Sequence, residues 1–162
     1  TRQEAERALA VVRDWTEGAA LRLHPEKTQL VDVQQPGGFD FLGYHFDRGH
    51  RRPRKKSLMK LKDAVRHKTR RTSGDSLAVI IADVNRTLRG WFAYFKHSHR
   101  STFRPIDEWV RARLRHILHR RHGGRRRAGA ATHRRWPRRF FVAQGLFSVQ
   151  HAHAAARQSY VR

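Results

Sequence analysis

Residues 54–98 read RKKSLMKLKDAVRHKTRRTSGDSLAVIIADVNRTLRGWFAYFKHS, and this stretch decides the fold of most of the chain. Apolar residues recur at steps of three and four over 58–65 and again over 77–88, which is the spacing of a helix with one buried side. Lysine and arginine fill most positions between the apolar residues of the first segment. The sequence SGDS at 73–76 separates the segments and supplies a turn with an N-cap for the second helix. The stretch therefore predicts helices, the first of which is basic on its outer side.

Further helices are expected on the C-terminal side. Asn85 is expected to interrupt the second helix, so that a short third helix covers 88–98. Pro105 suits the first turn of another helix, and apolar residues over 106–118 give that helix a buried side. Residues 119–135 contain almost no large apolar side chains and several glycines, which predicts a mobile basic loop.

The N-terminal part has a different pattern. Residues 2–20 have apolar side chains at steps of three and four, which predicts an amphipathic helix. Gln29–Val33 and Phe39–Phe46 each alternate polar and apolar residues with QQPGG between them, which predicts a β-hairpin. Residues 48–56 contain a proline and many charges and are expected to form a basic linker.

Positive charge lies on one side of a sharp boundary at Arg48. The chain has 36 Lys and Arg against 13 Asp and Glu, a net charge of +23. Up to Arg48 there are six basic and eight acidic residues, and beyond it there are thirty and five. Such a field opposes compaction unless an anion screens it, so the second part is expected to bind a polyanion. Basic side chains bind phosphates and aromatic faces stack on unpaired bases, so RNA or single-stranded nucleic acid is the leading candidate.

The aromatic residues of the basic part allow two interpretations. They recur at helical spacing, as core residues do, so each ring either lies in the core or offers a face to a base. Trp91 and Phe95 are expected in the core, while Arg89 and Lys96 beside them are expected to contact nucleic acid.

Composition and motifs limit other classes of function. The chain has no cysteine, which excludes disulfides and cysteine-ligated zinc, and it has no apolar run of about 18 residues that could span a membrane. His116, His119 and His122 lie at three-residue steps, but no carboxylate lies near them in sequence to complete a metal site. Asp107 and Glu108 are explained by the first turn of a helix, where the dipole stabilises acids. With no phosphate loop and no activated nucleophile, the motifs favour a nucleic-acid-binding module.

Four segments in chain order carry a resemblance to a known family. They are LRLHPEKTQLVD (21–32), GFDFLGYHF (38–46), the stretch 54–98 and HRRWPRRFFVAQGLFSV (133–149). In that order they resemble the palm motif after the catalytic aspartates, the primer grip, the thumb or domain X, and the C-terminal segment of reverse transcriptase/maturases encoded by group II introns. LRGWFAYF, within the third segment, makes the resemblance specific.

This resemblance implies an α+β fold. The expected domains are the C-terminal edge of a polymerase palm (1–48, a helix plus a β-hairpin), a helical thumb or domain X bundle (49–121), and a basic loop with a C-terminal segment that binds RNA or DNA (122–162). The family's Tyr-Ala-Asp-Asp strand does not occur, and the chain begins at Thr1, so we expect a fragment. Such a fragment lacks the palm carboxylates that would hold Mg²⁺ in a complete member, so no cofactor and no polymerase activity are expected of it alone.

The resemblance also implies site residues. Lys27 matches a lysine near the incoming nucleotide, with a surface ion pair to Glu26 or Asp32 as the alternative. The primer-grip candidates are Phe41, Leu42, Gly43 and Tyr44. The RNA-binding candidates are basic residues of the thumb and tail: Lys55, Lys56, Lys60, Lys62, Arg66, Lys68, Arg70, Arg71, Arg89, Lys96, Arg113, Arg125, Arg126, Arg127, Arg134 and Arg135. No catalytic or metal-ligating residue is expected.

The expected function combines the charge pattern with the resemblance. The chain is expected to bind structured group II intron RNA and a template–primer duplex or target DNA, and so to assist splicing and reverse transcription in the bacterial cytoplasm. The remaining palm and fingers of the polymerase are a further expected partner. Two alternatives stay open: a subunit that completes a split reverse transcriptase, and a generic basic RNA- or DNA-binding protein. The generic protein is favoured if Leu30 and Phe41 do not lie on neighbouring strands.

Overall fold

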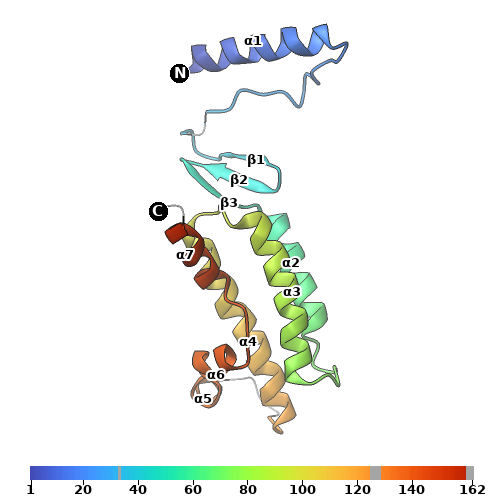
Figure 1. The fold of residues 1–162 in the computed structure, drawn as a ribbon, viewed down its shortest axis with the longest axis vertical. Coiled ribbons are helices and arrows are strands. Elements are labelled where there is room, and N and C mark those ends of the chain that lie inside the picture. The colour runs from blue at the N-terminus through green and yellow to red at the C-terminus, as the bar shows by residue number, and fades with distance from the viewer. Residues whose placement is uncertain (33, 125–128, 160–162) are drawn as a thin grey trace.

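The computed structural model describes residues 1–32, 34–124 and 129–159. A small sheet lies between one N-terminal helix and a bundle of helices (Figure 1). In chain order the elements are α1 (Arg2–Gly18), β1 (Phe39–Phe41), β2 (Tyr44–Asp47), β3 (His50–Pro53), α2 (Lys55–Lys68), α3 (Leu77–Phe95), the 3₁₀ turn η1 (Arg100–Thr102), α4 (Phe103–Arg121), α5 (Ala130–Arg135), α6 (Arg138–Ala143) and α7 (Val149–Ser159). The expected α+β fold, with a helical bundle after an antiparallel sheet, is confirmed.

The core lies within the helical bundle. Helices α2, α3 and α4 run in alternating directions, and α7 returns along α4 toward the sheet (Figure 1). Their apolar sides meet because residues at steps of three and four fall on one side of each helix. The apolar side chains with the least exposure are Val65, Ile80, Val84, Leu88, Phe103, Val110, Leu114, Ile117, Phe141 and Val149.

Helix α3 is one continuous helix. The predicted break at Asn85 is wrong. The side chain of Asn85 forms hydrogen bonds with another segment, and the helical backbone continues through this residue. Its Nδ2 donates to the carbonyl of Gly145 at 2.8 Å, and its Oδ1 accepts from the N–H of Phe147 at 2.7 Å. Asn85 thereby anchors the segment before α7 to the bundle. The predicted cap at the start of the helix is confirmed, since the Ser76 hydroxyl accepts from the N–H of Val79 at 3.3 Å.

Two tight hairpins build the sheet. Phe39–Phe46 contributes two paired strands, β1 and β2, where one had been expected. The linker expected over 48–56 is also wrong, because β3 pairs with β2 and α2 begins directly after it. The central turn residues are Leu42, Gly43, Arg48 and Gly49. All four have positive φ, as two-residue type I′ hairpin turns require.

The segment before the sheet is irregular. Gln29–Asp32 does not form the expected strand, and Val33, the last residue of that strand, lies outside the described residues. The carboxylate of Asp32 accepts from the N–H of Gln34 at 2.9 Å and from Nε2 of Gln35 at 3.4 Å. A side chain that bonds the nearby backbone in this way competes with strand pairing.

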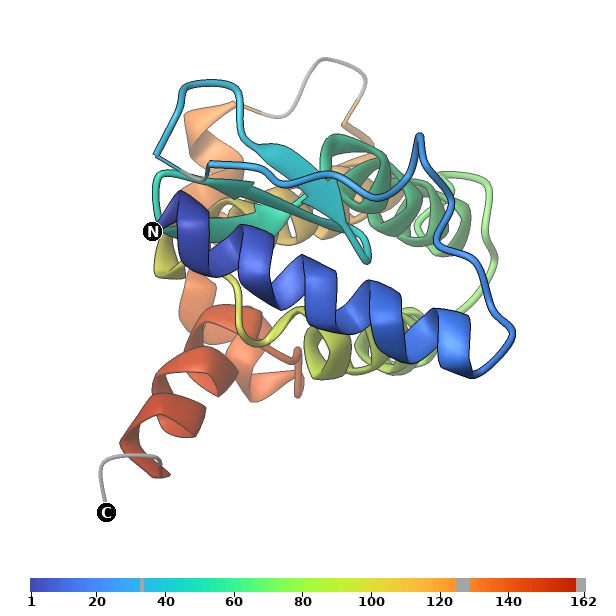
Figure 2. The same ribbon diagram turned by 90° about the horizontal axis from the view of Figure 1, so that it is seen from above.

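Helix α1 forms where it was predicted, but its apolar stripe is not buried. Val12 and Trp15 are 47% and 71% exposed, and α1 lies beyond the sheet, away from the bundle (Figures 1 and 2). Leu30 and Phe41 do not lie on neighbouring strands, an outcome that taken alone favours the generic basic RNA- or DNA-binding protein, and both side chains are exposed. An amphipathic helix gains most of its stability when another surface covers its apolar side.

The far end of the bundle contains more helix than the sequence predicts. The loop expected over 119–135 is wrong for the described residues, because α4 extends into it and α5 occupies its second half. Arg115 of α4 is buried, and its Nε donates to the carbonyl of Trp136 at 2.9 Å, which holds the end of α5 against α4. None of the described helices is both long and apolar enough to span a bilayer.

An acidic residue of α4 holds the start of α7. Asp107 and Glu108 had been expected in the first turn of their helix, which is wrong because α4 begins one turn earlier. Asp107 is only 3% exposed. Its carboxylate accepts from the N–H groups of Val149 and Gln150 at 3.0 and 3.2 Å and from the hydroxyl of Ser148 at 2.5 Å. It therefore satisfies N–H groups that the first turn of a helix leaves without partners.

Candidate nucleic-acid interface

Cations gather where α2 lies against α4. We call this surface the α2–α4 face and define it by Lys62, Arg66, Arg71, Arg113 and Arg120. Lys62 Nζ and the Arg66 guanidinium lie 5.9 and 5.7 Å from the ring centre of Trp109 on α4, because residues four apart share one side of a helix. Lys55 precedes Lys62 by two helical turns and so lies on the same side of α2.

Electrostatic coupling links the four arginines of this face. Burial lowers the pKa of Arg113, and the charges of Arg66 and Arg71 lower it further. Burial also lowers the pKa of His116, and three cations of the face are among the charges that add to this effect. Within the described part of the chain, only Arg66 of the five defining residues pairs with a carboxylate, that of Asp63. The face therefore carries an excess of positive charge that an anion would relieve.

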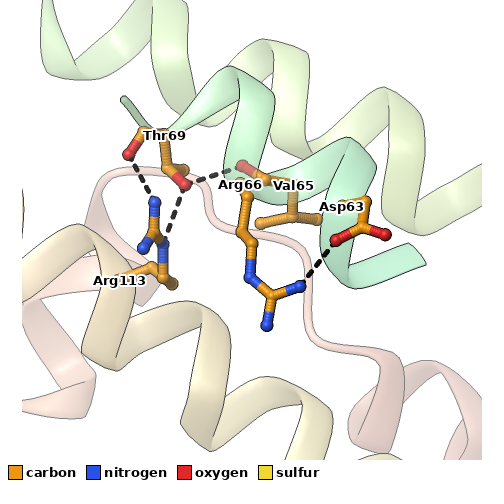
Figure 3. A network of polar contacts seen from close by, with 5 residues as sticks. All are labelled: Asp63, Val65, Arg66, Thr69 and Arg113. Carbon is orange, nitrogen blue, oxygen red and sulfur yellow. Dashed lines mark hydrogen bonds and ion pairs between the residues drawn. The ribbon is translucent and has the colours of Figure 1, made fainter. Parts of the chain in front are cut away.

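Arg113 also fixes the two helices together. Its Nε donates to the hydroxyl of Thr69 at 3.1 Å, and its Nη2 donates to the Thr69 carbonyl at 2.8 Å (Figure 3). The Thr69 hydroxyl donates in turn to the carbonyl of Val65 at 2.6 Å, while Arg66 pairs with Asp63 at 2.6 Å. Arg113 is a predicted RNA contact, but two of its N–H groups already hold the end of α2 against α4.

The other basic residues of α2 point in different directions. Lys56 and Lys60 are exposed on the side of the helix opposite its buried residues. Lys68 faces α3, where the pKa of Asp83 is lowered first by its hydrogen bond with Arg86 and also by the charge of Lys68. Helix α2 therefore presents only part of its charge on the α2–α4 face.

The remaining RNA-binding candidates differ in how they are held. Arg89 lies 4.6 Å from the ring centre of Phe147. Lys96 is half-buried at the end of α3, next to the sheet. Arg89 is exposed, and so are Arg70, Arg134 and Arg135. The candidates that lie outside the described residues are Arg125, Arg126 and Arg127.

Most aromatic rings of the basic part belong to the core. The buried rings are Phe95, Phe103, Trp136 and Phe141, and those packed against them include Trp91, Phe92, Trp109, Phe140 and Phe147. The predicted core position of Trp91 and Phe95 is confirmed. Because so few rings are left free to stack on bases, the surface is better suited to contacts with phosphates and with RNA shape.

The primer-grip candidates form the joint between the sheet and the bundle. The Tyr44 hydroxyl donates to the carbonyl of Tyr94 at 2.5 Å, and the Tyr94 hydroxyl donates to the carbonyl of Leu42 at 2.6 Å. Burial raises the pKa of Tyr44, so its hydroxyl stays a donor. Phe41 and Leu42 are 57% and 67% exposed at the tip of this hairpin. The structure thus gives Tyr44 a structural role and leaves Phe41 and Leu42 available to a partner.

Replacing Gly43 with alanine is expected to lower the free energy of unfolding by about 1–2 kcal/mol. Gly43 has a φ of 80°, and an added methyl group would lie 3.3 Å from Ser57 Oγ and 3.6 Å from the ring of Phe95. Gly74→Ala is the control, because nothing lies within 4 Å of its added methyl group. Urea denaturation of both variants measures the difference, and equal effects would show that the hairpin turn does not depend on glycine.

Lys27 lies in an exposed turn, and its backbone N–H donates to the carbonyl of His24. Its ammonium pairs with neither Glu26 nor Asp32 in the described structure, so the ion-pair alternative does not form. A role for Lys27 near a nucleotide stays a prediction.

Metal ligands do not gather in the described residues. No group of three or more histidine and carboxylate side chains there could hold an ion. The Mg²⁺ implied by the polymerase resemblance prefers carboxylate oxygens, and the described part of the chain does not bring such a set together.

Two features of the α2–α4 face were missed in the sequence. Arg120 was not among the predicted contacts, although it follows Arg113, which was predicted, and His116 at steps of three and four along α4, and this spacing was the available signal. For Trp109, the sequence predicted either a core position or a ring that stacks on a base, and it did not predict a ring beside two cations. Its contact with Lys62 and Arg66 depends on how two helices pack, which the sequence pattern does not specify.

A comparison with known families matches residues 58–140 to the model described as "Group II intron, maturase-specific domain". The match begins within α2 and ends within α6, so it contains all five defining residues of the α2–α4 face. No curated protein matches the chain.

Proposed function

The chain belongs to the group II intron maturase family, and from this premise we propose that it assists splicing by binding the folded intron RNA through the α2–α4 face. The observation that carries the proposal is the overlap between the family match and this face. Five cations lie there with a single carboxylate partner among the described residues. Neutralising phosphates with lysine and arginine releases counterions and is the main source of affinity for nucleic acid.

Binding of this kind would act on the RNA by mass action. A protein that contacts phosphates brought together by RNA folding binds the folded RNA and not the extended strand. At a free concentration of 100 times its Kd, such a ligand stabilises the folded form by about 2.7 kcal/mol. The bundle supplies a rigid surface for this purpose, because α2 and α4 are fixed by buried apolar contacts and by the Arg113–Thr69 hydrogen bonds.

The double variant Lys62→Gln/Arg66→Gln is expected to weaken the salt dependence of RNA binding. Each neutralised phosphate contributes about 0.7–0.9 to the slope of log K against log salt concentration, so two lost contacts lower the slope by about 1.5. Fluorescence anisotropy with a labelled group II intron RNA, repeated over a series of salt concentrations, measures this slope.

Lys56→Gln/Lys60→Gln is the matched control, because it removes the same charge from the solvent-facing side of the same helix, opposite the buried residues. We expect a much smaller change in its slope. Circular dichroism establishes that both variants keep the bundle. Equal losses in the two variants would contradict the proposal, since the charge of α2 would then act without a preferred face.

A second function, as part of a reverse transcriptase, is favoured by the uncovered stripe of α1. Val12 and Trp15 are exposed on α1, and Phe41 and Leu42 are exposed on the first hairpin of the sheet. We propose that the remaining palm and fingers pack on these exposed side chains, and that the bundle then also holds a template–primer duplex. Primer extension with and without a separate palm–fingers chain tests this function, and extension that never depends on the present chain would refute it.

A further inference from the structure

A second cationic site lies at the opposite end of α2 and α4 from Arg71 and Arg120. A cavity of about 560 Å³ opens where β3, the end of α3, η1 and α7 meet. The charged and titratable side chains in its wall include Arg51, Lys96, His99, Arg100, His153 and Arg157. No carboxylate lines the cavity in the described structure. Its volume is within the range of about 300–1,000 Å³ that is typical of pockets for small ligands, so it is large enough for a nucleotide with its phosphate.

The wall of this cavity is built from fixed residues. Arg51 Nε donates to the carbonyl of His97 at 2.6 Å, and the N–H of His99 donates to the Arg51 carbonyl at 2.8 Å. The ring of His153 stacks on the buried ring of Phe103 at 4.4 Å. Ser98 also lines the cavity and is only 3% exposed. Its hydroxyl has no hydrogen-bond partner among the described residues, which is costly for a buried polar group and leaves a donor available.

The positive charge around the cavity lowers the pKa values of two of its histidines. Burial lowers the pKa of His99, and the charges of His50, Arg52, Arg100 and Arg157 lower it further. Burial also lowers the pKa of His153, with Arg157 and His99 adding to the effect. These charges come from β3, η1 and its N-cap, and α7, and all of them oppose protonation of the two rings.

We infer that this cavity binds a phosphate group of RNA, separately from the phosphates held at the α2–α4 face. This inference rests on the proposed function, which makes RNA the source of the phosphate. Among the described residues, the cavity combines a cluster of cations that no acid opposes with a hydroxyl that has no partner, which matches the charge and the acceptor oxygens of a phosphodiester. Lys96, one of the predicted RNA contacts, belongs to this cavity and not to the α2–α4 face.

Histidine NMR signals of the whole chain, titrated with inorganic phosphate and then with a short hairpin RNA, test the inference. A bound phosphate favours the imidazolium form, so both ligands are expected to raise the pKa of His99 and of His153. Because the pKa values of both free rings lie below the ordinary histidine value of about 6.5, affinity for inorganic phosphate should increase as the pH falls below that value. Signals are assigned with single His→Gln variants, and failure of inorganic phosphate to shift either histidine would overturn the inference.

Arg157→Gln is the variant for the RNA arm, and Arg139→Gln, exposed on α6 at the far end of the bundle, is its control. Arg157→Gln is expected to weaken phosphate binding about tenfold and to lower the salt slope of RNA binding by about 0.7–0.9. Arg100→Gln should have the same two effects, which guards against a folding defect in one variant.

If inorganic phosphate shifts the NMR signals of the histidines but RNA does not, the assignment to RNA is overturned in favour of a free phosphate compound. If instead Lys62→Gln/Arg66→Gln leaves RNA binding unchanged while Arg157→Gln weakens it, the α2–α4 proposal fails and the cavity stands.

Discussion

Replacing Asp107 with alanine is expected to lower the free energy of unfolding by about 3 kcal/mol. The carboxylate accepts three hydrogen bonds at the start of α7, and hydrogen bonds to charged groups contribute about 1.5–3 kcal/mol each without being additive. Alanine would leave the N–H of the buried Val149 without a partner. Part of this loss is offset because the variant no longer keeps a charge buried. Urea denaturation gives the free energy, and hydrogen exchange shows whether α7 detaches first.

Two milder substitutions separate the contributions to this junction. Asp107→Asn keeps an acceptor oxygen but removes the charge, so about half of the loss is expected. Ser148→Ala removes one hydrogen bond to Asp107 and one to the N–H of His151, for a cost of about 1–2 kcal/mol. If Asp107→Ala were as stable as the unmodified chain, the start of α7 would not depend on α4, and the packing of α7 would have to come from apolar contacts alone.

The arginines of α4 explain why the charge pattern predicts a class of partner but not the contacts. Arg113 and Arg121 donate to backbone carbonyls of the loop between α2 and α3, and Arg115 donates to the carbonyl of Trp136. In the sequence these three look like the other arginines of α4, yet in the structure they hold neighbouring segments in place. Whether an arginine donates to a backbone carbonyl depends on the segment that packs beside it, and the spacing of residues along one helix does not predict that segment.

Helix positions in the bundle were predictable because periodicity reports burial directly. The apolar steps over 58–65 and 106–118 became the buried sides of α2 and α4. Asn85 shows where a prediction from residue type fails, because its low helix propensity predicted a break in the helix that does not occur. Its amide in fact bonds Gly145 and Phe147, some 60 residues along the chain, and such a partner cannot be found locally.

Strand prediction failed where local turns decided the outcome. Leu42 and Arg48 adopt positive φ although neither is glycine, so the two hairpin turns were not evident from residue type. The alternation of polar and apolar residues over Gln29–Val33 predicted a strand. In the described part of that segment the Asp32 carboxylate accepts from the N–H of Gln34 instead, and no strand forms. The cavity beside His99 was invisible for a different reason: residues from Arg51 to Arg157 meet there only after the bundle has closed.

Replacing Phe103 with alanine is expected to have the largest effect, a loss of about 3–5 kcal/mol in the free energy of unfolding. Phe103 is fully buried at the first residue of α4. Its ring centre lies 5.7 Å from Phe92, 6.5 Å from Trp91 and 4.4 Å from the ring of His153. The substitution would leave a cavity between α3, α4 and α7, because rings fixed on three helices cannot collapse fully into it.

This variant also links the core to the second cationic site. Phe103→Leu keeps much of the volume and should cost clearly less, while Val79→Ala, at a half-exposed position of α3, should change stability by about 0.5 kcal/mol or less. If His153 owes its position to the ring beneath it, Phe103→Leu should weaken phosphate binding while the bundle stays folded, as circular dichroism and histidine NMR would show together. A Phe103→Ala variant with unchanged stability would contradict the packing of α4 against α3 and α7, and with it the rigid bundle on which both cationic sites depend.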